Sequence, residues 1–279
     1  AANRIYEVLS MEVKISDPKN PESFDENKKG LVEFKNVTFK YPGANEAVLE
    51  NISFTAKPGE TTAFIGSTGS GKSTLINLIP RFYEVTDGKI EVDGVDIRNV
   101  NQHDLRDKIG LVPQKGLLFS GTIKSNLTYG APDASDEELE EVIKIAQAKE
   151  FIDQKEKRLD DPISQGGTNV SGGQKQRLAI ARAIAKKPEI FIFDDSFSAL
   201  DFKTDAKLRN ELNKMIEKTR STVLIVGQRI ASIMSANQII VLDEGKIVGK
   251  GTHDELMKNC KVYQEIAYSQ LSKEELGHE

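Results

Sequence analysis

The chain has 279 residues, of which 38% are hydrophobic and 29% charged, as in an ordinary globular protein rather than a disordered or fibrous one. Its net charge of −5 argues against a nucleic-acid-binding protein, because phosphate backbones are bound by clustered lysine and arginine. The single cysteine excludes a disulfide within the chain and fits a reducing compartment. The three histidines lie far apart in sequence and do not have the spacing of a zinc site.

The first 30 residues are predicted to lead into the folded part of the chain. Residues 3–10 resemble the end of a helix, and residues 11–30 hold two prolines and many charges, which indicates a linker. Residues 31–41 and 47–57 then alternate apolar and polar side chains, and this pattern predicts an antiparallel strand pair.

From residue 61 onward the pattern alternates between strand and helix. We predict strands at 61–66, 89–92, 109–112, 189–193 and 222–226, a hairpin over 238–250 that turns at Glu244 and Gly245, and helices at 72–83, over most of 133–187, and at 203–218, 229–235 and 253–268. Alternating strands and helices indicate an α/β fold with a parallel sheet that is covered on both faces.

The stretch "GSTGSGKST" matches the phosphate-binding loop G-x-x-x-x-G-K-[ST]. Its residues are Gly66, Ser67, Thr68, Gly69, Ser70, Gly71, Lys72, Ser73 and Thr74. Backbone N–H groups of such a loop surround a β-phosphate, the lysine reaches the β- and γ-phosphates, and the serine hydroxyl holds Mg²⁺. A chance glycine-serine turn is the alternative, but this loop follows a predicted strand and opens a predicted helix, as phosphate binding requires.

A second carboxylate site follows the strand "IFIFD". A strand parallel to the one before the loop brings Asp194 to the same edge of the sheet, where its carboxylate can hold Mg²⁺. The alternative is that Asp194 caps the helix that follows. The phosphate loop favours the metal role.

Together with these two motifs, "VSGGQKQR" at 170–177 resembles the nucleotide-binding domain of an ATP-binding cassette (ABC) transporter, and the resemblance covers residues 31–268. It implies a RecA-like P-loop core with a mostly parallel sheet, an N-terminal antiparallel β subdomain and an inserted α-helical subdomain at about 115–187. It also implies a linker from an absent membrane domain at 1–29, a nucleotide-binding domain at 30–270 and a tail at 271–279.

In that family two such domains face head to tail, and each ATP lies between the phosphate loop of one and the signature of the other. The resemblance therefore implies that Ser171, Gly172, Gly173 and Gln174 contact the ATP of a second ABC subunit. Groups at a helix N-terminus suit a γ-phosphate. The alternative for Ser171 is a simple helix cap.

Three further positions match the family one at a time. Tyr41 resembles the aromatic residue that stacks on adenine, although it could also belong to the core. Gln114 resembles the glutamine that contacts Mg²⁺ and the attacking water. Asp201, in "SALD", resembles the loop through which the two domains sense each other.

Residues 117–127 and 166–169 resemble exporters rather than importers, and exporters of this type often carry six membrane helices in front of this domain. The chain begins with Ala1 rather than methionine, has no signal peptide, and has no stretch apolar enough to span a membrane. We therefore expect a fragment of a membrane protein, located at the cytoplasmic face of the cell membrane with the membrane domains as partners.

Two positions depart from the family. Asp195 stands where a glutamate normally polarises the attacking water, and a reach shorter by about 1 Å can cost on the order of 10²-fold in rate. Gln228 stands where the family has a switch histidine, and glutamine carries no positive charge. With Gln114, these are the candidate catalytic residues, and Ser73, Gln114 and Asp194 are the candidate Mg²⁺ ligands.

Weakened hydrolysis beside intact ATP-binding motifs resembles the degenerate-site subunit of a heterodimeric bacterial multidrug ABC exporter. The alternatives are a slow homodimeric exporter ATPase and a module that dimerises on ATP without hydrolysing it. A soluble ABC ATPase acting on DNA or ribosomes is disfavoured by the acidic net charge.

Overall fold

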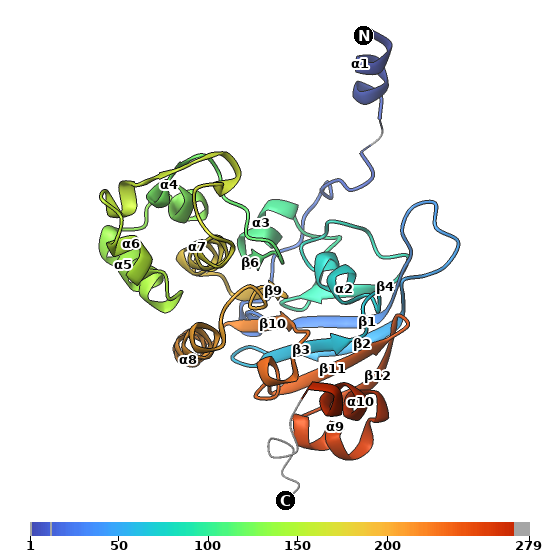
Figure 1. Cartoon of the computed structure of the whole chain (residues 1–279). Coiled ribbons are helices and arrows are strands. Elements are labelled where there is room, and N and C mark those ends of the chain that lie inside the picture. Colours follow the sequence, from blue (N-terminus) through green and yellow to red (C-terminus); the bar gives the residue numbers. More distant parts are fainter. Residues whose placement is uncertain (1, 12, 271–279) are drawn as a thin grey trace, which may run out of the picture.

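A six-stranded sheet forms the centre of this computed structural model, which describes residues 2–11 and 13–270 (Figure 1). In spatial order its strands are β12 (Lys246–Gly251), β11 (Gln238–Asp243), β3 (Thr61–Gly66), β10 (Thr222–Val226), β9 (Ile190–Asp194) and β6 (Ile109–Val112). Neighbouring strands are parallel except in the β11–β12 pair, which is the predicted hairpin. The predicted α/β fold with a mostly parallel sheet is therefore confirmed.

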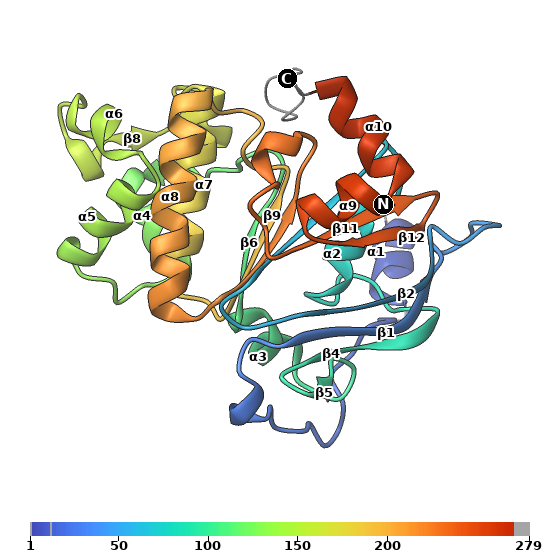
Figure 2. The same cartoon turned by 90° about the horizontal axis from the view of Figure 1, so that it is seen from below.

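Both faces of this sheet are covered, because successive side chains of a strand point to opposite faces. In β9, Phe191 and Phe193 belong to the core that packs under the long helices α7 (Gly172–Ala185) and α8 (Phe202–Thr219). Ile190 and Ile192 belong to a second core that includes α2 (Lys72–Leu78). Figures 1 and 2 show α7 and α2 on opposite sides of β9.

A smaller antiparallel sheet lies against the second core. Its strands, in spatial order, are β2 (Leu49–Ala56), β1 (Val32–Phe39), β4 (Asp87–Val92) and β5 (Val95–Asp96). Phe34 of β1 stacks on Phe54 of β2 at 4.5 Å between ring centroids, and Phe54 meets Phe64 of β3 at 5.3 Å. The two sheets therefore share apolar side chains, and the predicted antiparallel pair of β1 and β2 is confirmed.

Short helices account for most of the remaining chain. They are α1 (Ala2–Leu9), α3 (Gln102–Asp107), α4 (Ile123–Leu127), α5 (Asp136–Ile145), α6 (Lys149–Asp153), α9 (His253–Asn259) and α10 (Lys261–Gln270), with 3-10 turns η1 (Glu26–Lys28), η2 (Thr128–Gly130), η3 (Arg158–Asp160), η4 (Gln165–Gly167) and η5 (Ile230–Ser232). Helices α4 to α7 lie together at one end of the molecule (Figures 1 and 2). Over residues 2–11 and 13–270, the structure has no helix long and apolar enough to cross a membrane.

Two predicted helices are shorter than expected. The helix predicted over 72–83 ends at Leu78. Ile79 still has helical angles, but Pro80 has no N–H to continue the helical hydrogen bonds, and Arg81 has a left-handed φ of 56°. The helix predicted over 229–235 is only the 3-10 turn η5. The helix predicted over 253–268 is divided at Cys260, whose backbone is extended.

The prediction of a nearly continuous helical stretch over 133–187 is wrong for residues 154–171. This part contains η3, η4 and β8 (Pro162–Ile163), which pairs with β7 (Gly121–Thr122). Gly166 and Gly167 both have left-handed backbone angles, with φ of 65° and 64°, which a helix does not accommodate. Helices α3 and α4 were not predicted. The domain boundaries given above stay predictions, and the tail at 271–279 lies outside the described residues.

Candidate functional site

The phosphate loop connects the end of β3 to the start of α2 and passes very close to β11. A methyl group on Gly66 would lie 2.0 Å from the carbonyl oxygen of Leu242, so the loop can follow this path only with glycine. Gly71 directly precedes α2 with a left-handed φ of 97°. The glycines of the motif therefore sit where the backbone needs them.

Lys72 lies inside this loop and is almost completely buried. Its Nζ donates to the carbonyl oxygens of Gly66 at 3.0 Å and Ser67 at 2.7 Å. Burial lowers the pKa of Lys72, while the negative charges of Asp195 and Asp194 act in the opposite direction. The loop thus surrounds the ammonium of Lys72 with its own oxygen atoms, including the Ser70 hydroxyl at 3.2 Å.

Ser73 and Asp194 join the start of α2 to the end of β9. The Ser73 hydroxyl donates to Asp194 Oδ1 at 2.9 Å. Burial raises the pKa of Asp194, and so does the neighbouring Asp195, while the Ser73 hydrogen bond lowers it. A hydroxyl and a carboxylate are hard oxygen ligands of the kind that Mg²⁺ prefers.

The three candidate catalytic residues meet at one oxygen atom. Oδ2 of Asp195 accepts hydrogen bonds from Nε2 of Gln228 at 2.7 Å and from Nε2 of Gln114 at 3.1 Å. Asp195 is 8% exposed and has a left-handed φ of 47°. The two residues that depart from the family pattern are therefore bonded to each other.

Tyr41 lies beside the far end of the phosphate loop. Its hydroxyl is 3.0 Å from the hydroxyl of Thr74, and its ring makes edge contacts with Phe39 at 4.8 Å and Tyr83 at 5.2 Å. Tyr83 was missed by sequence reasoning. An aromatic residue in "PRFYEV" was its only signal, and that segment was predicted to be helical.

The signature lies at the start of α7, on the other side of β9 from the phosphate loop. Ser171 caps this helix: its hydroxyl accepts the N–H of Gln174 at 3.2 Å, and the Gln174 side chain accepts the N–H of Ser171 at 3.0 Å. No atom lies within 4 Å of a methyl group placed on Gly172, and Gly173 is half-buried. The structure does not bring the signature to the phosphate loop of its own chain.

Asp201 also caps a helix, because its carboxylate accepts the N–H of Thr204 at 3.0 Å at the start of α8. Hydrogen bonds to Thr204 hold the pKa of Asp201 below its usual value. Both predicted positions at the opposite domain's ATP, Ser171 and Asp201, therefore have a structural role within this chain as well.

Gln176 ties the Gln114 segment to the signature helix and was missed by sequence reasoning. Its side chain accepts the N–H of Gly116 at 2.8 Å and donates to the carbonyl oxygen of Pro113 at 3.1 Å. Gln176 is almost fully buried. A second glutamine in "SGGQKQR" was the signal that could have identified it.

The model of the family described as ABC transporter matches residues 49–198, which is more than half of the chain. The chain belongs to the ABC transporter family. The matched region contains the phosphate loop, the signature and Asp194.

Individual relatives of this ABC domain agree. It is 47% identical, over 99% of its length, to an uncharacterized ABC transporter ATP-binding protein of Mycobacterium tuberculosis, of which it covers 47%. It is 44% identical, over 88% of its length, to the beta-(1→2)glucan export ATP-binding/permease protein of Rhodopseudomonas palustris, of which it covers 41%. The chain thus spans about half the length of the curated relatives it matches.

Among solved structures, a bacterial Atm1-family ABC exporter with ATP bound superposes with a TM-score of 0.91 at 32% identity. The match covers 97% of this chain and 47% of the exporter chain. The expected ABC fold of exporter type is therefore confirmed, and this chain is an ATP-binding domain of the ABC transporter family.

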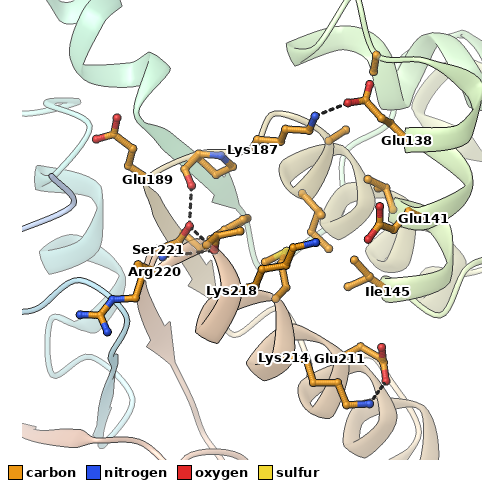
Figure 3. A pocket seen from close by; sticks show the side chains of 18 of the residues that line it. Glu138, Glu141, Ile145, Lys187, Glu189, Glu211, Lys214, Lys218, Arg220 and Ser221 are labelled. Atoms are coloured by element: carbon orange, nitrogen blue, oxygen red, sulfur yellow. Dashed lines mark hydrogen bonds and ion pairs between the residues drawn. The ribbon is translucent and has the colours of Figure 1, made fainter.

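A cavity of about 730 Å³ lies beside the residues that precede β9 and β10, whereas the phosphate loop follows the other end of the parallel strand β3. Figure 3 shows the residues that line this cavity. The cavity opens between α5, α8 and the residues that precede β9 and β10. Several of its charges neutralise each other, as in the ion pairs Lys187–Glu138, Lys214–Glu211 and Lys29–Glu189. The cavity contributes nothing to the candidate nucleotide site.

Proposed function

We propose that this ABC domain is one of two ATP-binding cassettes of an exporter, at the cytoplasmic face of a membrane. It binds Mg-ATP in its own phosphate loop, pairs head to tail with a second cassette, and couples ATP binding and hydrolysis to export. The partners are the second cassette, in a heterodimer, and the membrane domains. The exporter names of its relatives support this proposal.

ATP binding would use groups that are already close together. Lys72 would turn its ammonium from the loop carbonyls toward the phosphates, and the N-terminal end of α2 adds a favourable dipole for an anion. Ser73 and Asp194 would hold Mg²⁺, with Gln114 beside them. The metal, when bound, neutralises charge on the phosphate oxygens. Tyr41 would offer its ring to adenine.

Hydrolysis at this site is proposed to be impaired, and the bond between Gln228 and Asp195 is the observation that supports this most directly. A general base must reach the attacking water with a free lone pair. Here Oδ2 of the short Asp195 carboxylate already accepts two amide hydrogen bonds, which leaves only Oδ1 to act as the base, and Gln228 offers no positive charge to a γ-phosphate. The site would therefore bind ATP but hydrolyse it slowly.

The signature would serve the other cassette. Ser171, Gly172, Gly173 and Gln174 would face the partner's γ-phosphate at the start of α7, and Asp201 would lie at the junction of the two domains. In this arrangement the partner supplies a full-length glutamate and a switch histidine, so hydrolysis occurs at the composite site that contains this chain's signature.

The test is steady-state ATPase of the assembled exporter with Asp195→Ala or Ser171→Ala. We expect Ser171→Ala to lower turnover strongly, because it removes a contact to charge that develops in the transition state. We expect Asp195→Ala to be much milder. Equal losses from both variants would instead indicate a homodimer with two identical sites, and no turnover in the unaltered assembly would indicate a dimerisation module without ATPase activity.

A further inference from the structure

The segment that carries Gln228 is held by a residue far along the chain. Gln270, at the end of α10, uses one side-chain amide for two backbone contacts. Its Nε2 donates to the carbonyl oxygen of Gln228 at 2.8 Å, and its Oε1 accepts the N–H of Ile230 at 2.8 Å. These bonds lie on either side of Arg229, so they fix both the position and the direction of the backbone there.

This segment has little regular structure that could hold it in place. It contains only the single turn η5, and the residue that precedes the turn, Arg229, makes no side-chain cap. At the other end of the turn, Arg209 of α8 donates to the carbonyl oxygen of Ser232. The Arg209 guanidinium also lies 4.2 Å from the ring centroid of Phe197. Contacts from α10 and α8 therefore hold the two ends of the segment.

Helix α10 is itself anchored firmly enough to act as a support. Tyr263 and Ala267 are fully buried, and the Tyr263 hydroxyl lies 2.8 Å from Nδ1 of His253. The helix packs beside β3 and β11, the strands next to the phosphate loop. The position of Gln270 is thus set by the core and not by the surface alone.

We propose that Gln270 is a positioning residue for the nucleotide site. It fixes the backbone of Gln228, and Gln228 in turn orients the carboxylate of Asp195. Helix α10 therefore controls this site, and any binding event that displaces the end of α10 releases the Gln228 segment. The proposal rests on the proposed function, in which Gln228 and Asp195 face the γ-phosphate.

Amide hydrogen exchange of the full-length protein tests whether the two hydrogen bonds of Gln270 hold the Gln228 segment, and it requires no ATP. In Gln270→Ala the amide of Ile230 should exchange faster by roughly 3- to 10-fold, since one hydrogen bond is lost. The matched control is Gln264→Ala, because Gln264 lies on the same helix and bonds the carbonyl oxygen of Met257 at 2.8 Å instead. If exchange at Ile230 is unchanged in Gln270→Ala, or equally fast in both variants, then Gln270 does not hold the Gln228 segment and the proposal is overturned.

ATPase of the assembled exporter tests the consequence, with Asp195→Glu as the background that gives this site a longer base. Gln270→Ala should lower kcat by about 3- to 10-fold with KM for Mg-ATP unchanged, whereas Gln264→Ala should not. Gln270→Glu, which keeps the acceptor for Ile230 but loses the donor, should fall between them.

The loss should disappear when Gln228→Ala is added, because Gln270 acts through that residue. A Gln270 effect that persists in the absence of Gln228, or no effect on kcat, overturns the positioning role. If Asp195→Glu alone fails to raise turnover, the proposal that this site is impaired in hydrolysis is wrong. The exchange experiment still decides whether Gln270 holds the Gln228 segment.

Discussion

The phosphate loop and the signature differ in how completely this chain builds them. The loop is enclosed by its own protein: Gly66 touches β11, and Lys72 is buried among loop carbonyls. The signature is open: Ser171 and Gly172 are exposed, and Gly172 has free space around it. The phosphate loop is therefore an anion site built almost entirely by this chain. The signature would need a second protein surface to form an enclosed ligand site.

This difference separates two kinds of constraint on sequence. Residues of the loop are constrained both by packing and by ligand binding, so their substitution should change the stability or the ATP affinity of the isolated domain. In the proposed function, residues of the signature contact mainly the ligand of a second cassette, so their substitution should affect mainly the assembled exporter. The following predictions test that division.

The largest difference in stability is expected between two glycine substitutions. Gly66→Ala should destabilise the domain by about 3 kcal/mol, because the new methyl group collides with the backbone of β11. Gly172→Ala should change the free energy of unfolding by less than about 0.5 kcal/mol. Denaturant unfolding of both variants measures this. A similar cost for both would mean that the signature is structurally as constrained as the loop.

Nucleotide affinity should separate two lysines. Lys72→Ala should weaken binding of Mg-ATP to the domain by about 10- to 150-fold, because a charge-assisted contact worth about 1.5–3 kcal/mol is lost. Lys175→Ala, directly after the signature, should leave this affinity unchanged. Isothermal titration calorimetry measures both, and an unaltered affinity in Lys72→Ala would argue against the loop as the ATP site.

Two helix caps provide a sharper test of the signature. Ser171 and Ser135 each form a capping box, with Gln174 and Glu138 respectively. Ser171→Ala and Ser135→Ala should therefore cost a similar amount of stability, about 1 kcal/mol. Only Ser171→Ala should also lower ATPase of the exporter. If Ser135→Ala lowers it equally, the effect of Ser171 comes from the cap and not from contact with ATP.

The smallest effect near neutral pH is expected from Asp194. Its raised pKa means that the folded domain favours the protonated carboxyl, so this contribution to stability is present in acid and is lost as the pH rises through the raised pKa. Mg²⁺ needs the ionised form, so the gain in ATP affinity on adding Mg²⁺ should decline as the pH falls. Calorimetry with and without Mg²⁺ over a pH series measures this gain. Asp194→Asn is the control and should lose the gain at every pH.

Sequence reasoning predicted the central sheet better than the segments around it. The strands β9 and β10 are runs of apolar residues, and such runs are typical of strands buried on both faces. It failed over 154–171, where composition is compatible with a helix but paired glycines and the β7–β8 contact determine another path. The length of the helix predicted over 72–83 was also overestimated, because the apolar spacing continues past Pro80, which has no N–H to donate, and past Arg81, which has a left-handed φ of 56°.

The candidate site divides in the same way. The local sequence by itself determined the left-handed glycine that opens α2 and the caps at Ser171 and Asp201, because these features involve residues a few positions apart. The strand that ends at Asp194 was predictable from its apolar run, although its hydrogen bonds go to β10 and β6. Only the tertiary structure decided that Gln114 and Gln228 share one oxygen of Asp195 and that Gln270 grips the segment of Gln228. These contacts join residues 81, 33 and 42 positions apart. Parallel strand order and the packing of α10, rather than any local pattern, bring them within hydrogen-bonding distance.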